Sequence, residues 1–347
     1  MKVTIKDVAR EANVSIATVS RVINGKDRVK KETRLKIEKA IKKLNFRPDQ
    51  AARTMIMKET KTIGLMIPVL TNEYWAGLSE VIQDTLGEKG YTLIIGSDNM
   101  NPDKQEALFN VFQERKVDGI IVGSVLSDKT VKHVDDLKQE GTPIVSLYPF
   151  YSNVNCVTGD HVQGAMDAVQ HLLQLGHRKI AYIGAASTSD YREMGYRNAL
   201  MMSSIKMDES IIIKTNDMVR KFSHYGYESI NKLIESKGEF TAVFCANDLM
   251  AIGAIKALKE AGIKVPEDVA VVGFDDISMA GLYQPSLTTV QQPIKEMGKA
   301  TVDMLLELIL HKDEPIAKKV TFPMKLIVRE SCGAKKFMPS DNKQLSL

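Results

Sequence analysis

At 347 residues, with 44% hydrophobic and 26% charged side chains, the chain exceeds what one hydrophobic core usually serves and has an ordinary globular composition. No apolar run approaches the ~20 residues of a membrane span, and no apolar signal segment follows Met1. Three widely spaced cysteines argue against a disulfide framework or a zinc cluster. The net charge of +4 is uneven, because residues 1–61 have 11 Lys and 6 Arg against 3 Asp and 4 Glu. We therefore expect a cytoplasmic protein of two or more domains with a basic N-terminal part.

This basic part has a net charge of +10, and the rest of the chain has a net charge of −6. Such an asymmetry suggests a polyanion partner for the first 61 residues alone. A solvated helical surface that happens to be rich in Lys would give the same count. Charge by itself does not separate these two interpretations, so the motifs must decide.

Residues 1–47 are predicted to form three short helices. Thr4 can cap the first, Asn13 suits a left-handed turn after it, and Ser15 can cap the second. A third helix is expected over residues 32–44, where apolar positions alternate with Lys and Arg. Two short helices joined by a tight turn, with a third that closes a small core, make a helix-turn-helix unit.

The segment TIKDVAREANVSIATVSRVINGKDRVKKETRLKIEKAIKKLNFRPDQAARTM resembles the DNA-binding head of the lactose/galactose repressor (LacI–GalR) family. The resemblance implies that the second helix enters the major groove, with Ile16, Ala17 and Arg21 toward the bases. Arg21 is expected to make a bidentate contact to guanine, and Ile16 and Ala17 apolar contacts. Phosphate contacts are expected from nearby polar residues, namely Thr4, Ser15, Thr18, Ser20, Asn24 and Lys30. Capping alone would also explain Thr4 and Ser15.

Residues 48–61 are predicted to be a hinge helix and linker. Pro48 ends the third helix, and about two helical turns could follow, too few to be stable alone in water. In the family this segment folds on the operator and pushes an apolar side chain into the minor groove. The resemblance thus implies DNA contacts from Ala52 and Met55, with Met55 where relatives usually have Leu. An ordinary interdomain linker is the alternative.

From residue 62 to 333, short apolar runs alternate with amphipathic helical patterns, which predicts an α/β core with parallel sheets. The expected strands are 63–68, 91–96, 119–123, 143–147, 179–184, 211–214, 242–245 and 269–274. The expected helices include 75–89, 104–115, 162–175, 248–261 and 294–310. Eight strands are too many for one small sheet, so we expect two lobes with a ligand cleft at the strand carboxyl ends.

The motifs GAMDAVQHLLQLGHRKIAYIG, YREMGYRNAL, AVFCANDLMAIGAIKAL and VPEDVAVVGFDDI are similar to the effector-binding core of the same family. That core is itself similar to periplasmic sugar-binding proteins, so the implied fold is a helix-turn-helix head plus a two-lobed periplasmic-binding-protein-like core. The resemblance implies that Arg192, Asn247 and Asp275 bind effector hydroxyls, a donor and acceptor set that suits a polyol.

Aromatic residues are expected to form walls of this site. The resemblance places Tyr74 and Trp75 over the ligand, with Phe222 opposite, although packing alone is the commoner role of an aromatic residue on a loop. Tyr148 stands where many relatives have an acidic residue, and Ser124 occupies the small position after IIVG. Since both change the pocket, the resemblance transfers no particular sugar to this chain.

Motifs for catalysis or metal binding are absent from the sequence. There is no phosphate-binding loop, nucleophile elbow, zinc-protease motif or dinucleotide fingerprint. His171 and His177 are six residues apart, on different helix faces, and are poor joint metal ligands. Asp275 and Asp276 could be paired carboxylates, but no nucleophile lies near them in sequence. We predict no enzyme activity, no metal and no cofactor.

The assembly implied by the resemblance is a homodimer on a pseudo-palindromic double-stranded operator. The tail, residues 334–347, has no leucine heptad, which argues against a tetramer formed through the tail. The predicted function is a DNA-binding transcriptional regulator, most often a repressor in this family, whose operator affinity is modulated by a sugar-like effector. The alternatives are a carbohydrate-binding module or a sugar-modifying enzyme without a DNA role.

Overall fold

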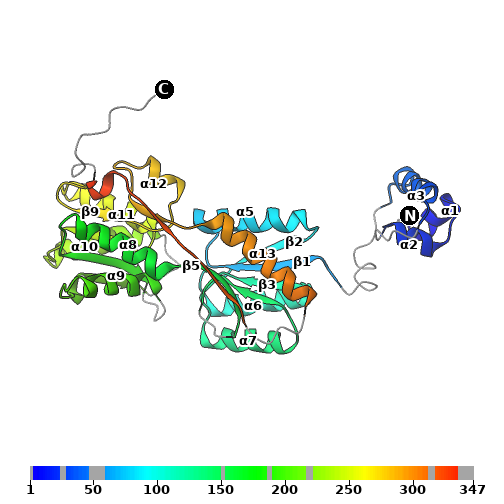
Figure 1. Cartoon of the computed structure of the whole chain (residues 1–347), viewed down its shortest axis with the longest axis horizontal. Coiled ribbons are helices and arrows are strands. Elements are labelled where there is room, and N and C mark those ends of the chain that lie inside the picture. The colour runs from blue at the N-terminus through cyan, green and yellow to red at the C-terminus, as the bar shows by residue number, and fades with distance from the viewer. Residues whose placement is uncertain are drawn as a thin grey trace, which may run out of the picture. The chain divides into compact units, whose positions relative to one another are not determined.

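The computed structural model describes residues 3–23, 29–46, 59–149, 153–185, 190–215, 222–311 and 317–334. The chain divides into two compact units, residues 1–61, here called the head, and residues 62–347, here called the core. Figure 1 shows both units with their helices and strands labelled. Each unit is described by itself below.

The head contains three helices around a small apolar centre. They are α1 (Ile5–Glu11), α2 (Ile16–Ile23) and α3 (Lys31–Lys43). Between α1 and α2 the chain turns at Asn13, whose φ of 52° is the left-handed conformation expected there. The Thr18 amide donates to Ser15 Oγ at 3.2 Å, which confirms Ser15 as a cap of α2. The centre consists of small and branched side chains: Val8, Ala9, Ala12, Val19, Val22, Ile37 and Ala40.

The first lobe of the core is built on a six-stranded sheet in the order β11-β5-β4-β3-β1-β2, all of whose neighbours are parallel. Its strands are β1 (Thr62–Ile67), β2 (Thr92–Ser97), β3 (Gly119–Val122), β4 (Ile144–Ser146), β5 (Asn155–Gly159) and β11 (Lys319–Phe322). Helices cover both faces, with α5 (Glu73–Glu88) and α13 (Ile294–Leu310) on one and α6 (Pro102–Glu114) and α7 (Asp128–Gln139) on the other (Figure 1).

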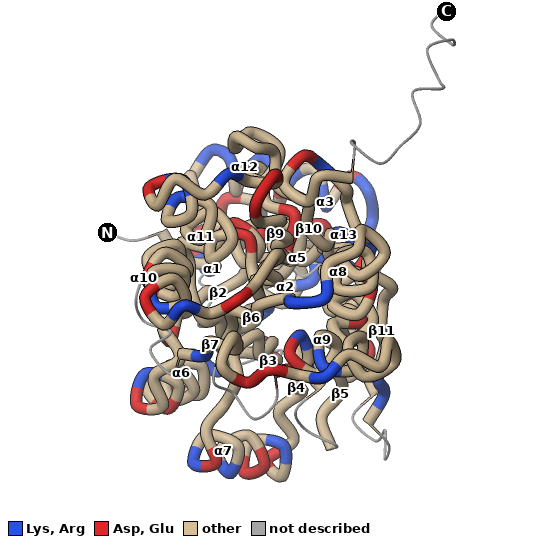
Figure 2. The backbone as a smooth tube through the Cα atoms, turned by 90° about the vertical axis from the view of Figure 1, so that its left-hand side faces the viewer, with Lys and Arg blue, Asp and Glu red and all other residues tan. Residues whose placement is uncertain are grey.

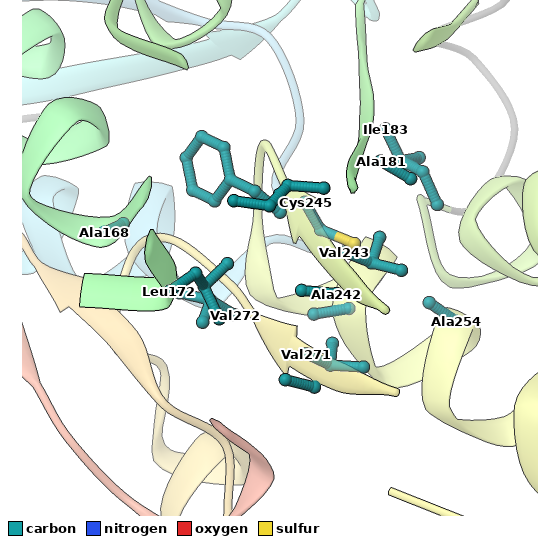
Figure 3. Packing of buried hydrophobic residues seen from close by; sticks show 14 of the residues in the cluster. Ala168, Leu172, Ala181, Ile183, Ala242, Val243, Cys245, Ala254, Val271 and Val272 are labelled. Atoms are coloured by element: carbon teal, nitrogen blue, oxygen red, sulfur yellow. The ribbon is translucent and has the colours of Figure 1, made fainter. Parts of the chain in front are cut away.

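The second lobe has a four-stranded parallel sheet in the order β7-β6-β8-β9. Its strands are β6 (Ile180–Ala185), β7 (Ile212–Thr215), β8 (Ala242–Cys245) and β9 (Ala270–Val272). Its helices are α8 (His161–Gln174), α9 (Tyr191–Met202), α10 (Phe222–Glu235), α11 (Asp248–Glu260) and the short α12 (Ser278–Leu282). Side chains such as Leu172, Val243 and Val272 pack between sheet and helices (Figure 3).

Within the described residues the chain passes between the lobes at three places. The first lies between β5 and α8, and the second between β10 (Thr289–Gln291) and α13. The third joins β11 to β12 (Lys325–Ile327), which pairs antiparallel with β10. The lobes are therefore formed by interleaved parts of the chain, and the crossing segments lie beside the space between the two sheets.

The predicted strands and helices that fall on described residues are present, with ends within two residues of the predicted ones. The predicted hinge helix, within residues 48–61, falls on residues that the structure does not describe. The strands β5, β10, β11 and β12 and the helices α7, α9, α10 and α12 were not among the predicted elements. In the first of these, Asn155–Gly159, only Cys156 and Val157 are apolar, which is a weak strand pattern. The structure thus confirms the α/β class with parallel sheets in two lobes.

The outer surface of the core helices has mixed charge. On α7 there are three lysines and three aspartates, and Figure 2 shows both signs on this helix. No helix in the described ranges is long and apolar enough to cross a membrane.

Helices α10 and α11 approach each other closely at Gly253, and this contact gives a stability prediction. A Cβ on Gly253 would lie 1.8 Å from the Ser223 carbonyl oxygen, a backbone atom that cannot move by itself. Gly253→Ala is therefore expected to destabilise the core by about 1–3 kcal/mol or more. Gly87→Ala in α5, where a Cβ meets open space, is the control and should be neutral or stabilising. Urea unfolding followed by circular dichroism measures both, and equal midpoints would contradict the account.

Candidate nucleic-acid interface and interlobe cleft

The second head helix, α2, presents two different faces. Val19 and Val22 are buried against the other head helices. Ile16, Ala17 and Arg21 are exposed, with Ile16 45% exposed although it is a large apolar residue. An exposed apolar side chain beside an exposed arginine is the arrangement that base contacts in a major groove need.

The polar residues proposed to hold phosphates differ in exposure. Thr4, Ser15 and Lys30 are exposed, and Thr18 and Ser20 are half-buried. Thr4 also has a local role, because its backbone amide and its hydroxyl donate to the Asp7 carboxylate at 2.9 and 2.7 Å. These contacts lower the pKa of the Asp7 carboxyl. Three further residues predicted to contact DNA, Asn24, Ala52 and Met55, lie outside the described residues.

A cavity of about 370 Å³ lies between the two lobes of the core. Residues after strand carboxyl ends and at helix N-termini line it, as expected for parallel α/β sheets. Seven of the eight residues predicted from the sequence lie in its wall: Tyr74, Trp75, Tyr148, Arg192, Phe222, Asn247 and Asp275. They come from both lobes, so a ligand in the cavity would touch both.

Ser124 is the exception among the predicted cleft residues. Its neighbours Gly123 and Val125 line the cavity, but Ser124 is only 1% exposed and does not. Side chains alternate in direction along an extended segment, so Ser124 points away from the cleft where its neighbours face it. The structure places this hydroxyl behind the wall.

Arg192 and Asp275 form the charged centre of the cleft. The guanidinium Nη2 lies 3.2 Å from Asp275 Oδ1, and the other terminal nitrogen, Nη1, donates to the Ala246 carbonyl. The Gln292 amide also donates to Asp275 Oδ1, at 2.7 Å. Burial raises the pKa of the Asp275 carboxyl to about 6, although Arg192 and Gln292 oppose the rise. The guanidinium carbon of Arg192 lies 4.2 Å from the centre of the Phe274 ring, and this contact also holds the guanidinium in place.

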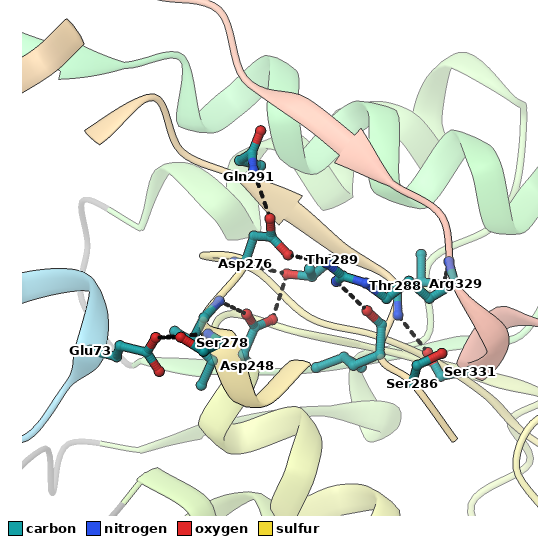
Figure 4. A network of polar contacts seen from close by, with 12 residues as sticks. Glu73, Asp248, Asp276, Ser278, Ser286, Thr288, Thr289, Gln291, Arg329 and Ser331 are labelled. Carbon is teal, nitrogen blue, oxygen red and sulfur yellow. Dashed lines mark hydrogen bonds and ion pairs between the residues drawn. The ribbon is translucent and has the colours of Figure 1, made fainter. Parts of the chain in front are cut away.

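Asp275 and Asp276 occupy a sharp turn after β9, with positive φ values of 118° and 55°. The turn gives the two carboxylates different partners. Asp276 accepts from Arg329 at 2.7 Å and from the Gln291 amide at 2.7 Å (Figure 4). The two neighbouring acids are thus held in separate ion pairs, which argues against joint acid–base chemistry.

A contact between lobes lies beside this turn. Glu73, the first residue of α5, accepts hydrogen bonds from the backbone amide and the hydroxyl of Ser278 at the start of α12 (Figure 4). Behind it, the buried Asp248 accepts from the Ile277 amide at 2.9 Å and from the Thr289 hydroxyl. Because Glu73 directly precedes Tyr74 and Trp75, this contact joins one cleft wall to the other lobe.

Helix caps place two further polar groups at the cleft. Asn247 Oδ1 accepts from the Met250 amide at 2.8 Å, so its side-chain nitrogen is the group left for a ligand. Asp190 caps α9 by accepting from the amides of Arg192 and Glu193. Asp160 caps α8 by accepting from the Gln163 amide at 3.0 Å.

Aromatic rings form a continuous wall. Tyr74 and Trp75 meet edge to face with centroids 4.9 Å apart, and Trp75 lies 6.2 Å from Tyr148. Several other residues line the cavity that were not predicted from the sequence, among them Asn72, Gln105, His161, Asp190, Tyr191, Thr215 and Met250. Their common signal is position, since most directly follow a strand or begin a helix.

Among the described residues, no group of three or more His, Cys, Asp or Glu side chains could hold a metal ion. His171 Nε2 lies 3.3 Å from Cys332 Sγ, and His177 Nδ1 lies 3.0 Å from the Thr241 hydroxyl. The two histidines thus have separate partners.

Comparison with known proteins gives matches for both units. Residues 4–49 match the model of bacterial regulatory proteins of the lacI family, and residues 169–332 match a periplasmic binding protein-like domain. Catabolite control protein A of Priestia megaterium is 35% identical over 337 residues, covering 95% of this chain and 99% of that protein.

Two solved structures are similar over nearly the whole chain. One is the lac repressor dimer bound to operator and the anti-inducer ONPF, with 27% identity, a TM-score of 0.84 and coverage of 96% of this chain and 99% of that one. The other is a complex of the transcriptional regulator CelR with cellobiose, with 29% identity, a TM-score of 0.71 and coverage of 95% and 99%. These relatives are transcriptional regulators, not enzymes. The chain is therefore a member of the LacI family of DNA-binding transcriptional regulators, with a periplasmic-binding-protein-like effector-binding core.

Proposed function

We propose that this regulator is a homodimeric repressor that binds a pseudo-palindromic operator and changes its operator affinity when a sugar-like effector enters the interlobe cleft. In this proposal residues 1–47 read the operator, residues 48–61 are the hinge and linker, residues 62–333 bind the effector and the second copy, and residues 334–347 are a tail. The similar lac repressor structure contains a dimer on its operator, and the similar CelR structure contains cellobiose.

One observation carries the effector assignment. The cavity is lined by the guanidinium of Arg192, the carboxylate of Asp275 and the side-chain amide of Asn247. The aromatic rings of Tyr74 and Trp75 line the same cavity. Polar groups that can donate and accept suit the hydroxyls of a sugar, and ring faces suit its C–H surface. Phe222 and Tyr148 complete the aromatic lining.

The coupling follows from the lobe-to-lobe arrangement of the cleft. Since Trp75 belongs to the first lobe and Arg192 to the second, an effector that contacts both favours one relative lobe position. The contact between Glu73 and Ser278 lies across the same boundary and would change with that position. A lobe shift changes the spacing of the two hinge segments in the dimer, including Ala52 and Met55, and so the operator affinity. A coupling of about 1–3 kcal/mol, or 5–150-fold, is ordinary for such linkage.

Fluorescence anisotropy on a pool of pseudo-palindromic operators tests the proposal. The protein is titrated at two salt concentrations, with and without D-ribose, D-glucose and cellobiose. We expect tight, salt-sensitive and sequence-selective binding that one of these ligands shifts. Binding without any sequence selectivity would contradict the operator part, and selective binding that no sugar shifts would contradict the effector part.

The effector affinity is expected to fall as the pH drops through about 6. Protonation of Asp275, whose pKa is about 6, removes the charge that holds Arg192 and an acceptor for hydroxyls. Because this pKa lies above its value in the unfolded chain, the same protonation stabilises the fold, so stability should rise where affinity falls. Calorimetric titrations with the bound sugar between pH 5 and 8 measure the affinity. Asp275→Asn should bind weakly and show no such dependence, whereas an unchanged pH profile in this variant would refute the assignment.

A further inference from the structure

The cleft contains a buried imidazole that is not among the proposed hydroxyl contacts. His161 is the first residue of α8, directly after the crossing from the first lobe, and it lines the cavity. The residue is 5% exposed, and its Nδ1 atom is buried with no hydrogen-bond partner among the described residues. Buried polar atoms in native proteins are nearly always paired with protein, water or ligand, so this atom calls for a partner.

Two aromatic neighbours, one from each lobe, fix the plane of the imidazole. Tyr148, after β4, stacks at 5.5 Å with an interplanar angle of 12°, and Phe274, after β9, stacks at 5.8 Å and 21°. Both neighbouring rings lie nearly parallel to the imidazole, so its polar contacts are made through its edge, where the nitrogens lie. The ring cannot tilt away to find another partner without breaking both stacks.

The protonation state of His161 limits what it can bind. Burial, with a further contribution from Arg192, lowers the pKa of the imidazole well below its usual value, so the ring is neutral. A neutral imidazole has one donor and one acceptor nitrogen. A hydroxyl group can pair with either nitrogen, because it both donates and accepts.

The charges of the described cleft wall also favour an uncharged ligand. Its one cation of fixed charge, Arg192, is already paired with Asp275, and Asp190 adds a second carboxylate. A phosphate or carboxylate ligand would meet these two acids with no unpaired cation among the described lining residues. An uncharged ligand avoids that repulsion.

We infer that His161 contacts the effector directly, through a hydrogen bond to a hydroxyl of an uncharged polyhydroxyl ligand, and selects such a ligand over its phosphate ester. The inference rests on the proposed function, since it concerns the same cleft. It names a contact residue and a ligand class that the proposed hydroxyl contacts do not supply.

Calorimetric titration of the full chain at pH 7.5 tests this, with D-ribose, D-glucose and cellobiose and with ribose 5-phosphate and glucose 6-phosphate as probes. The bound neutral sugar should lose about tenfold in affinity in His161→Phe, which keeps a ring in the stack but removes both nitrogens. His133→Phe is the matched control, because His133 also packs on a ring, Phe109 at 5.2 Å, but lies on α7 outside the cleft. This control should bind as the parent does, and the phosphate esters should bind at least tenfold more weakly than the free sugars.

A sugar affinity unchanged in His161→Phe, or tighter binding of a phosphate ester, would overturn the inference while leaving the proposed function in place. Failure of all three neutral sugars to bind the parent protein would overturn both. A second readout does not depend on the folding of the variant. In protein labelled with ¹⁵N-histidine, the ring nitrogens of His161 should shift on sugar addition, and unshifted resonances under saturating sugar would refute the contact.

Discussion

Arg192→Ala is expected to abolish the effector response and to leave operator binding without effector unchanged. The Arg192 side chain is 15% exposed and that of Asp275 is 3% exposed, so the pair is well shielded from water. Arg192→Ala removes the planar donor proposed to meet the effector hydroxyls, and truncating a buried charged group that contacts a binding partner typically costs about 2–5 kcal/mol of binding. Effector affinity should therefore fall by about 30-fold or more.

Arg192→Lys distinguishes the loss of charge from the loss of shape. Lysine keeps the positive charge but cannot donate to Ala246 and Asp275 at once as a planar fork. We expect it to restore part of the affinity only. Calorimetry gives the effector affinity, anisotropy gives the operator affinity, and unchanged effector binding in Arg192→Ala would remove this residue from the site.

Arg21→Ala is expected to lower affinity for the specific operator far more than affinity for unrelated DNA. A bidentate contact to guanine discriminates by about 1–3 kcal/mol, and a symmetric dimer loses two such contacts. The combined loss is about 2–6 kcal/mol on the operator. On unrelated DNA only the phosphate attraction of one charge per copy is lost.

Arg10→Ala provides the matched control for the charge. Arg10 belongs to α1 and not to α2, its side chain is 82% exposed, and its Nη1 lies 3.6 Å from Asp7 Oδ1. Its removal should weaken binding to both DNAs to a similar, small extent. Anisotropy with both DNAs at two salt concentrations measures these changes, and an equal loss on both DNAs for Arg21→Ala would refute base reading.

The sequence predicted features that depend on local chemistry. Asn13 adopts the left-handed turn and Ser15 caps α2, as their residue types indicate. The core strands were found because continuous apolar runs such as Ile120–Val122 are buried on both faces of a sheet. The position of the ligand site then followed from the rule that such sites lie at the carboxyl ends of parallel strands.

Features that depend on long-range packing were not predicted. His161 follows a helix cap and looks like a solvated helix start, and only the folded chain brings the rings of Tyr148 and Phe274 to stack on it. Ser124 was assigned to the cleft because it follows a strand. Successive side chains of an extended segment point in opposite directions, and that of Ser124 is buried behind the cleft wall. The separate partners of Asp275 and Asp276 likewise come from residues far away in the sequence, such as Arg192 and Arg329.

A ligand in the cleft and an operator on the head are expected to change each other's affinity for the protein. The most direct measurement is a pair of titrations: the affinity for the bound sugar with and without saturating operator, and the affinity for the operator with and without saturating sugar. Linkage requires the two affinity ratios to be equal, and we expect a value of about 5–150. Ratios of one in both titrations, with sugar and operator each bound, would show that the cleft does not control the head.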